Sequence, residues 1–284
     1  KYWQFYLLFI PVLAFVIVFH YLPMYGIIYS FTEYKIGGTP IFCGLDQFKK
    51  LFGIVGADAT AVEIKLAQTK SAAFMLAFKN TIVYSVVKLL LNTGFAVIIS
   101  IFLNEMISTK FKKITQTLSI LPNFVSWTVI ALLLEAFIDP SSGMVSKVML
   151  NMGMTPDFYS NASFWPPILV LLKVWQGAGY GAIVYIATIV GIDPQIFEAA
   201  EIDGATRVQK ILRITLPILR PTIVLMSLFS VGRIFYGDFG MIYAVVGDNG
   251  LLFSTTDVID TYVYRMMRTL RNYGMSAATG MFQS

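Results

Sequence analysis

Long stretches without a charged side chain are the feature of this sequence that most restricts its fold. Residues 2–32 and 114–134 contain no Asp, Glu, Lys or Arg, and residues 158–192 contain only Lys173. About 20 apolar residues are enough for a helix to cross a bilayer, so each stretch can span a membrane. Only 13% of the whole chain is charged, against about a quarter in soluble domains. We therefore expect a membrane protein.

The charge-poor windows predict five complete spans and one incomplete span, all helical. The complete spans cover roughly residues 5–31, 80–103, 118–137, 164–190 and 216–236. A sixth begins near Met275, and its last ten residues would rise only about 15 Å in a hydrocarbon core about 30 Å thick. The prediction is an all-α, polytopic membrane protein with six transmembrane helices, the sixth truncated, in one domain over residues 1–284. Residues 241–246 are apolar but too short to span, and the turn signal at 247–250 follows them.

Lysine and arginine in the short loops predict the orientation, because cytosolic loops carry an excess of these residues. Three lysines lie at residues 110–113, and three basic residues lie at 207–213. We expect both loops, and hence the N-terminus, to be cytosolic. Residues 32–78 then form an external cap. Three arginines at residues 265–271 lie on the side expected to be external and argue against this orientation.

Composition excludes several kinds of function. One cysteine, Cys43, and one histidine, His20, cannot build an internal disulfide or a His/Cys metal site. The sequence lacks Gly-x-x-x-x-Gly-Lys-[Ser/Thr], Gly-x-Ser-x-Gly and His-Glu-x-x-His, so we expect neither ATP hydrolysis nor other catalysis by this chain. The sequence also lacks a basic run interleaved with aromatic residues, so we do not expect it to bind nucleic acid.

The segment before the fifth span carries the most specific pattern. Asp193 followed by Pro194 predicts the start of a helix, and Asp203-Gly204 predicts its end. Apolar residues at helical spacing over 205–216, with basic residues opposite, predict an amphipathic helix along the membrane face. Spacing alone favours a helical loop that rests on lipid headgroups.

The residue identities in this segment resemble a known signature. Glu198-Ala199-Ala200, Gly204, nine residues to Ile214, and Leu216-Pro217 resemble the EAA motif of permease subunits in binding-protein-dependent ABC importers. Further stretches are similar to the oligosaccharide-importing, maltose-type branch, and especially to the polysaccharide permeases of Gram-positive bacteria. They are Tyr21-Leu22-Pro23, Gly44-Leu45-Asp46-Gln47-Phe48, Trp175-Gln176-Gly177 and Ile192-Asp193-Pro194.

The resemblance implies a type I importer permease fold in a bacterial cytoplasmic membrane. Residues 191–217 would be the cytosolic coupling loop, which docks on an ATPase subunit. The coupling residues carried over are Glu198, Ala199, Ala200, Asp203, Gly204, Ile214, Leu216 and Pro217. The implied partners are a homologous second permease subunit in a heterodimer, two cytosolic ATPase subunits that bind ATP and Mg²⁺, an extracellular solute-binding protein and an oligosaccharide. The resemblance implies no cofactor on this chain.

Charged residues inside spans are candidates for the substrate path, because burying them is costly. Lys88, Lys173 and Arg233 meet this criterion, and Glu135 is the candidate counter-charge for Lys173. Aromatic rings stack on the apolar faces of sugars, while amides and carboxylates bind hydroxyl groups. The expected path residues are Asn123, Trp127, Lys173, Trp175, Gln176, Tyr180, Arg233, Tyr236 and Asp238, with Tyr185 as a further aromatic candidate. Aromatic belts and helix packing use the same residue types.

The sequence therefore predicts a permease subunit of an ATP-driven oligosaccharide importer. Surplus cations near the expected path indicate an acidic oligosaccharide, or else an acidic docking face on the binding protein. The alternative is a secondary transporter or channel for a small polar solute that works without an ATPase. A membrane-embedded enzyme would need polar catalytic clusters at helix ends, which the sequence does not contain.

Overall fold

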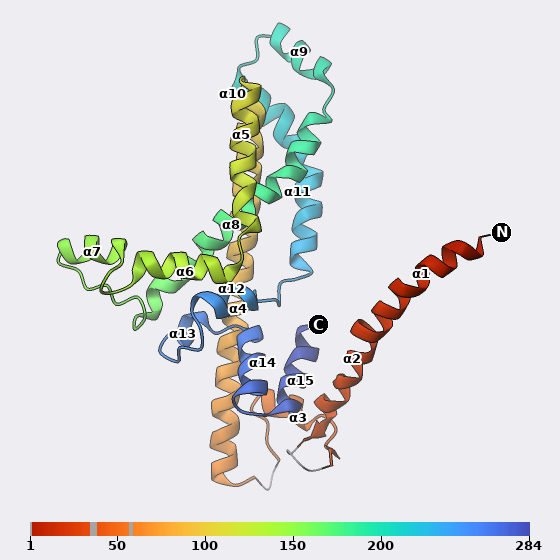
Figure 1. The fold of residues 1–284 in the computed structure, drawn as a ribbon, viewed down its shortest axis with the longest axis vertical. Helices are drawn as coiled ribbons and strands as arrows, with labels where there is room; N and C mark the ends of the chain where they lie inside the picture. Colours follow the sequence, from red (N-terminus) through yellow and green to blue (C-terminus); the bar gives the residue numbers. More distant parts are fainter. Residues whose placement is uncertain (1, 35–38, 57–58) are drawn as a thin grey trace. The chain divides into compact units, whose positions relative to one another are not determined.

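The computed structural model describes residues 2–34, 39–56 and 59–284, and it is built almost entirely of helices (Figure 1). Two compact units divide the chain. The terminal unit is Lys1–Phe78 with Val258–Ser284, and the central unit is Lys79–Asp257. Within the described residues the strands are β1 (Thr32–Glu33) and β2 (Ile41–Phe42), an antiparallel pair with Thr32 opposite Phe42. The predicted all-α fold is confirmed.

The terminal unit begins with an apolar helical segment that matches the first predicted span. Helix α1 (Trp3–Val16) leads into a π-helical turn at Ile17–Tyr21, α2 (Leu22–Met24) and a 3₁₀ segment at Tyr25–Phe31. Proline lacks an N–H and its ring crowds the preceding turn, so the widened turn before Pro23 accommodates it. No part of the apolar window is buried within the chain, which leaves the segment available to lipid or a partner subunit.

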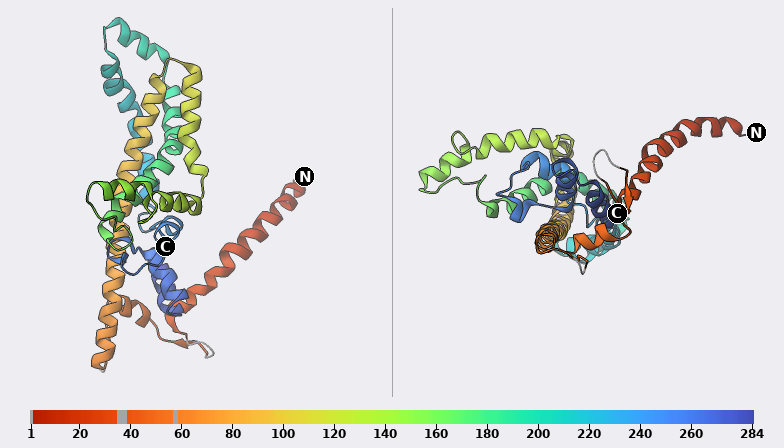
Figure 2. Two further views of the ribbon diagram at one scale, coloured as in Figure 1. Left: turned by 60° about the vertical axis from the view of Figure 1, so that its left-hand side comes forward. Right: turned by 90° about the horizontal axis from the view of Figure 1, so that it is seen from below.

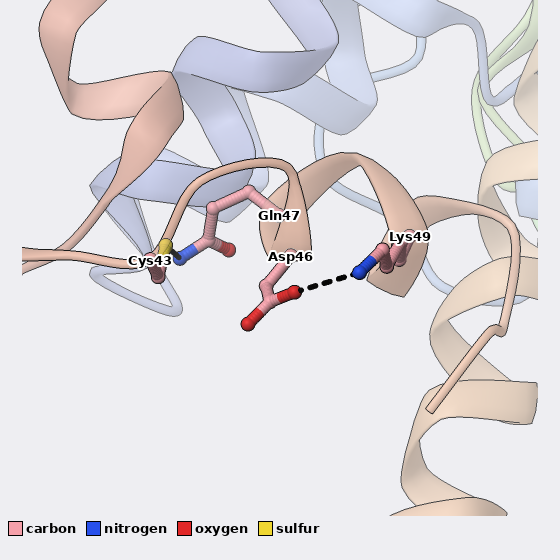
Figure 3. A network of polar contacts seen from close by, with 4 residues as sticks. All are labelled: Cys43, Asp46, Gln47 and Lys49. Carbon is pink, nitrogen blue, oxygen red and sulfur yellow. Dashed lines mark hydrogen bonds and ion pairs between the residues drawn. The ribbon is translucent and has the colours of Figure 1, made fainter. Parts of the chain in front are cut away.

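The core of the terminal unit lies where α15 (Tyr273–Gln283) packs on α14 (Ile259–Arg268) and α3 (Asp46–Leu51). Its fully buried members include Leu51, Phe74 and Tyr262. Beside this core, the Asp46 carboxylate and the Lys49 ammonium form an ion pair at 3.3 Å (Figure 3). The Gln47 side chain lies toward Cys43 (Figure 3). This unit contains the expected external cap, residues 32–78, of which 35–38 and 57–58 lie outside the described residues.

The second predicted span lies inside α4 (Ala61–Glu105), a helix of 45 residues that contributes to both units. The helix starts earlier than the predicted span because Thr60 and Glu63 form reciprocal hydrogen bonds at its first turn. The last 18 residues of the expected cap, 61–78, are therefore the first turns of α4.

The central unit is a bundle formed by α8 (Trp165–Val190) with α5 (Thr109–Ile120), α11 (Leu216–Val231) and the C-terminal part of α4. Helix α8 approaches α5 so closely that a Cβ on Gly179 would lie 1.9 Å from the carbonyl oxygen of Ser119. Only glycine fits at this contact. The elements of the unit that follow α4 are α5 (Thr109–Ile120), α6 (Trp127–Ile138), α7 (Met144–Asn151), α8 (Trp165–Val190), α9 (Pro194–Ile202), α10 (Arg207–Lys210), α11 (Leu216–Val231), α12 (Phe239–Val245) and α13 (Phe253–Thr256), with short 3₁₀ segments at Leu121–Phe124 and Ala162–Phe164.

The third predicted span is wrong as a continuous helix. The segment Thr109–Phe124 and helix α6 meet at an angle of 98° (Figure 2). Pro122 lies in the 3₁₀ turn that ends the first helix, and Ser126 caps α6 by accepting a hydrogen bond from the Val129 backbone. A new helix start therefore lies inside the charge-free window. Four helices in the described part of the chain are long and apolar enough to cross a membrane, or five with this bent pair.

The stretch 205–216 is helical from Arg207 onward, as predicted, but it is not a separate surface helix. Arg207–Val231 forms one helical segment of 25 residues, so the amphipathic stretch runs directly into the fifth span. A π-helical turn at Ile211–Thr215 precedes Pro217, where the missing N–H would otherwise interrupt the helix. The span ends at Val231 rather than Tyr236, and the short helix α12 packs on α6.

Candidate functional site

Helix α9 forms the tip of the central unit, between the end of α8 and the start of α10 (Figure 1). Asp193 accepts a hydrogen bond from the Gln195 backbone at 3.0 Å, and Pro194 is the first helical residue. The helix ends at Ile202, and the chain turns away from it at Gly204, whose φ is +76°. The Gly204 and Ala205 N–H groups bond back to the carbonyls of Glu201 and Ala200, a glycine-dependent C-terminal cap. Both predicted helix ends are confirmed.

The two faces of α9 differ in what they contact. Phe197 packs inward against the cluster that includes Ile189, Ile192 and Leu219. Glu198 and Ala199 are exposed, so this part of the expected coupling motif faces away from the bundle. Ala200, also on α9, is half-buried. The remaining motif residues lie on other elements: Asp203 and Gly204 in the exposed turn, a half-buried Ile214 in the π-helical turn, and Leu216 with Pro217 at the start of α11.

Two features of this loop are absent from the sequence prediction. The Glu201 carboxylate and the Lys210 ammonium form an ion pair at 2.5 Å, which joins α9 to α10 across the turn. This contact holds the pKa of Glu201 below its ordinary value. Ile202, the last residue of α9, is 87% exposed. Ile202 could have been found in the sequence, because it is a lone apolar residue between two charged neighbours. The ion pair could not, because its residues are nine positions apart and helical spacing pairs residues only three or four apart.

The predicted path residues Trp127, Lys173 and Asp238 come together in the central unit. The Lys173 ammonium lies 2.6 Å from an Asp238 carboxylate oxygen and 5.2 Å from the centre of the Trp127 ring. Lys173 lies on α8, Asp238 directly precedes α12, and Trp127 is the first residue of α6. We call these three residues the Lys173 cluster. The predicted pairing of Lys173 with Glu135 is wrong, because Asp238 is the counter-charge.

Asp238 adopts an unusual backbone conformation to reach Lys173. Its φ and ψ are 67° and 62°, in the left-handed region, and its side chain does not cap α12. Asp and Asn are the residues other than glycine that adopt this region most readily, because their side chains are short and polar. In this conformation the Asp238 carboxylate is paired with Lys173 rather than with the N-terminus of α12.

The other predicted path residues do not join the Lys173 cluster as one site. Gln176 is buried and donates to the Val125 carbonyl at 3.3 Å. Tyr185 is buried in the packing cluster with Ile189, so its expected path role gives way to a structural one. Tyr180 and Tyr236 have about half of their surface exposed, Arg233 is exposed in the turn after α11, and Asn123 is half-buried in the 3₁₀ turn before α6.

Trp175 lies on a different face of α8 from Lys173, in an apolar groove of about 980 Å³. The groove runs along α4, α5 and α8, and Tyr84 and Phe95 of α4 also line it. Helix α8 therefore has one face directed to the charged cluster and another to this groove.

Known proteins match nearly the whole chain. A family model described as "Binding-protein-dependent transport system inner membrane component" matches residues 92–282. Protein LplB of Bacillus subtilis (strain 168) is 31% identical over 283 residues, which cover 98% of this chain and 83% of that protein. The polygalacturonan/rhamnogalacturonan transport system permease protein YteP of the same strain is 28% identical over 280 residues, 98% of this chain and 82% of that protein.

Solved structures give the same result. A bacterial ABC transporter involved in the import of the acidic polysaccharide alginate is similar with a TM-score of 0.82 and 31% identity, over 99% of this chain and 90% of that one. A bacterial alginate ABC transporter in complex with an alginate pentasaccharide-bound periplasmic protein gives a TM-score of 0.79 and 30% identity, over 99% and 89%. The matched family region includes both the α9 loop and the Lys173 cluster.

Proposed function

Because this chain belongs to the binding-protein-dependent transport system inner membrane component family, we propose that it is a permease subunit of an ATP-driven oligosaccharide importer. The chain is a membrane transport subunit with the predicted all-α permease fold. In this proposal it pairs with a homologous second permease. An extracellular binding protein delivers the sugar, and two cytosolic ATPase subunits bind ATP and Mg²⁺.

The observation that carries the proposal is the exposed outer face of α9. The EAA-like residues Glu198 and Ala199 are exposed there, while Phe197 anchors the opposite face to the bundle. The Glu201–Lys210 ion pair and the continuous helix from Arg207 to Val231 connect this face to the fifth span. Movement of an ATPase bound to α9 would therefore move the span with it, as packed elements shift as bodies.

The Lys173 cluster supports a sugar as the transported molecule. It combines an aromatic ring with hydrogen-bonding charged groups, and sugars present both apolar ring faces and hydroxyl groups. The names of relatives and neighbours, which include a polygalacturonan/rhamnogalacturonan permease and an alginate importer, point to the same substrate class. We propose that the N-terminus and α9 are cytosolic and that residues 32–78 are external.

The test is reconstitution of the full transporter in proteoliposomes with its binding protein outside and ATP inside. Uptake of an oligosaccharide that depends on ATP supports the proposal. Uptake that continues unchanged when ATP is absent would favour a secondary transporter. Isolation of the tagged chain from native membranes without any ATPase subunit would also contradict the proposal.

A further inference from the structure

The charge on Lys173 is held where a neutral side chain would cost less. It is the only charged residue between 158 and 192, within a membrane-spanning helix. A charge in such a helix is costly, and where one is retained it marks a functional site with a partner. Asp238 is that partner here, and both side chains remain partly exposed, at 32% and 22%. The pair is therefore accessible to an incoming molecule rather than sealed in the core.

Trp127 makes this pair different from a structural salt bridge. Its ring lies 5.2 Å from the Lys173 ammonium and is itself only partly buried. The ammonium lies over one face of this ring, so a sugar bound at Lys173 through a carboxylate would also contact the indole. An ammonium group carries three hydrogen-bond donors, so it can bind an incoming carboxylate before it loses the first.

Asp238 is suited to release Lys173. Its backbone is left-handed and its side chain does not cap the helix that follows it. Loss of the ion pair would therefore cost α12 no capping hydrogen bond. The resident counter-ion can thus be replaced without loss of a helix cap.

On the basis of the proposed function, we propose that Lys173 selects sugars that carry a carboxylate, by exchange of counter-ions. The carboxylate of the substrate replaces that of Asp238 on the Lys173 ammonium, while the sugar ring contacts the Trp127 indole beside the ammonium. Asp238 turns to water, so the number of charges at the ammonium is unchanged. A neutral sugar cannot make this exchange, because it would leave Lys173 without a counter-ion inside the span. The substrate class is an acidic oligosaccharide, such as an oligouronide.

The experiment compares uptake of acidic oligosaccharides with uptake of their uncharged methyl esters. The full transporter is reconstituted with its binding protein and given trigalacturonate, trimannuronate or the methyl ester of either. The variants are Lys173→Gln, Lys173→Arg and Asp238→Asn. Lys147→Gln, which removes an exposed cation from α7, is the matched control. Since the binding protein is the same throughout, a change in the acid-to-ester ratio relative to the wild type reports the permease.

Counter-ion exchange predicts a specific pattern of ratios. Lys173→Gln lowers the acid-to-ester ratio about tenfold through a higher KM for the acid, and the ester is still imported. Lys173→Arg keeps the preference for acid, and Lys147→Gln leaves the ratio at the wild-type value. Asp238→Asn removes the competing carboxylate and lowers the KM for the acid. This last variant keeps the test decisive if Lys173→Gln fails to insert.

Two results separate failure of this inference from failure of the proposed function. ATP-driven import with a ratio unchanged in both Lys173→Gln and Asp238→Asn would overturn counter-ion exchange and leave the importer intact. Import of these sugars that is independent of ATP would overturn the proposed function, whatever the ratio.

Discussion

Replacement of Gly204 by valine changes the backbone turn of the coupling loop without removing any polar or charged side chain. Gly204 has a φ of +76°, and a Cβ there would meet no heavy atom within 4 Å. The cost is therefore backbone strain rather than a clash, about 1–2 kcal/mol for a residue with a Cβ and more for a β-branched one. The strain would be relieved by breaking the two hydrogen bonds from Gly204 and Ala205 to the end of α9.

The assay measures ATP hydrolysis and sugar uptake by the reconstituted transporter. Gly204→Val is expected to reduce uptake at least tenfold, because α9 loses its fixed angle to α10 and α11. Binding of sugar to the separate binding protein should be unchanged. The uncoupling would appear as ATP hydrolysis that sugar no longer stimulates.

Gly153 provides a matched control within the same chain. It ends α7 with a φ of +75°, has open space around its Cβ position, and is followed by the same pair of backward hydrogen bonds, from Gly153 and Met154. Gly153→Val therefore carries the same strain at a helix end away from α9. If the two variants reduce uptake equally, the special role of the Gly204 turn is refuted.

Three further predictions follow from the same structure. Ile202→Ala should weaken recovery of the ATPase with the purified permease, while Ile107→Ala, at a residue 84% exposed, should not; equal recovery would exclude Ile202 as a contact. Because Lys210 holds the pKa of Glu201 below its ordinary value, their ion pair should be complete above that ordinary value and lost as the pH falls through the lowered one. Glu201→Gln should remove this acid dependence of α9 hydrogen exchange, and an unchanged profile would show that the pair does not hold the loop. Cys43, partly exposed, should react with a membrane-impermeant thiol reagent on intact cells, and reaction only after permeabilisation would contradict the proposed orientation.

Local signals in the sequence predicted the ends of α9 correctly. An Asp before Pro and an Asp before Gly act through hydrogen bonds to their own backbone neighbourhood, so their effect does not depend on the rest of the fold. The same reasoning could have found the bend in the third span. Ser126 is an N-cap residue inside the apolar window, but hydropathy averaged over a window does not register a single cap.

The partner of Lys173 was beyond local reasoning. Asp238 follows it by 65 positions and Glu135 precedes it by 38, so both choices depend on how α6, α8 and α12 pack. The residue types indicated that Lys173 has an acidic partner, but they did not distinguish Asp238 from Glu135. Likewise, Tyr180 and Tyr185 are both tyrosines on α8, yet one is half-exposed and the other is buried against Ile189 and Leu219. The sequence does not reveal which face of a uniformly apolar helix is covered.

A cross-link from α9 to the ATPase tests directly whether α9 is the surface that couples this chain to ATP hydrolysis. Cys43 is the only cysteine in the sequence, so Cys43→Ser gives a background without thiols, and Ile202→Cys then places one thiol at the exposed end of α9. A thiol-to-amine cross-linker should join this residue to an ATPase subunit in native membranes, and ATP should change the yield. A matching Lys147→Cys chain should give no such product. Absence of an ATPase adduct at Ile202→Cys, in a chain that still supports uptake, would contradict the account.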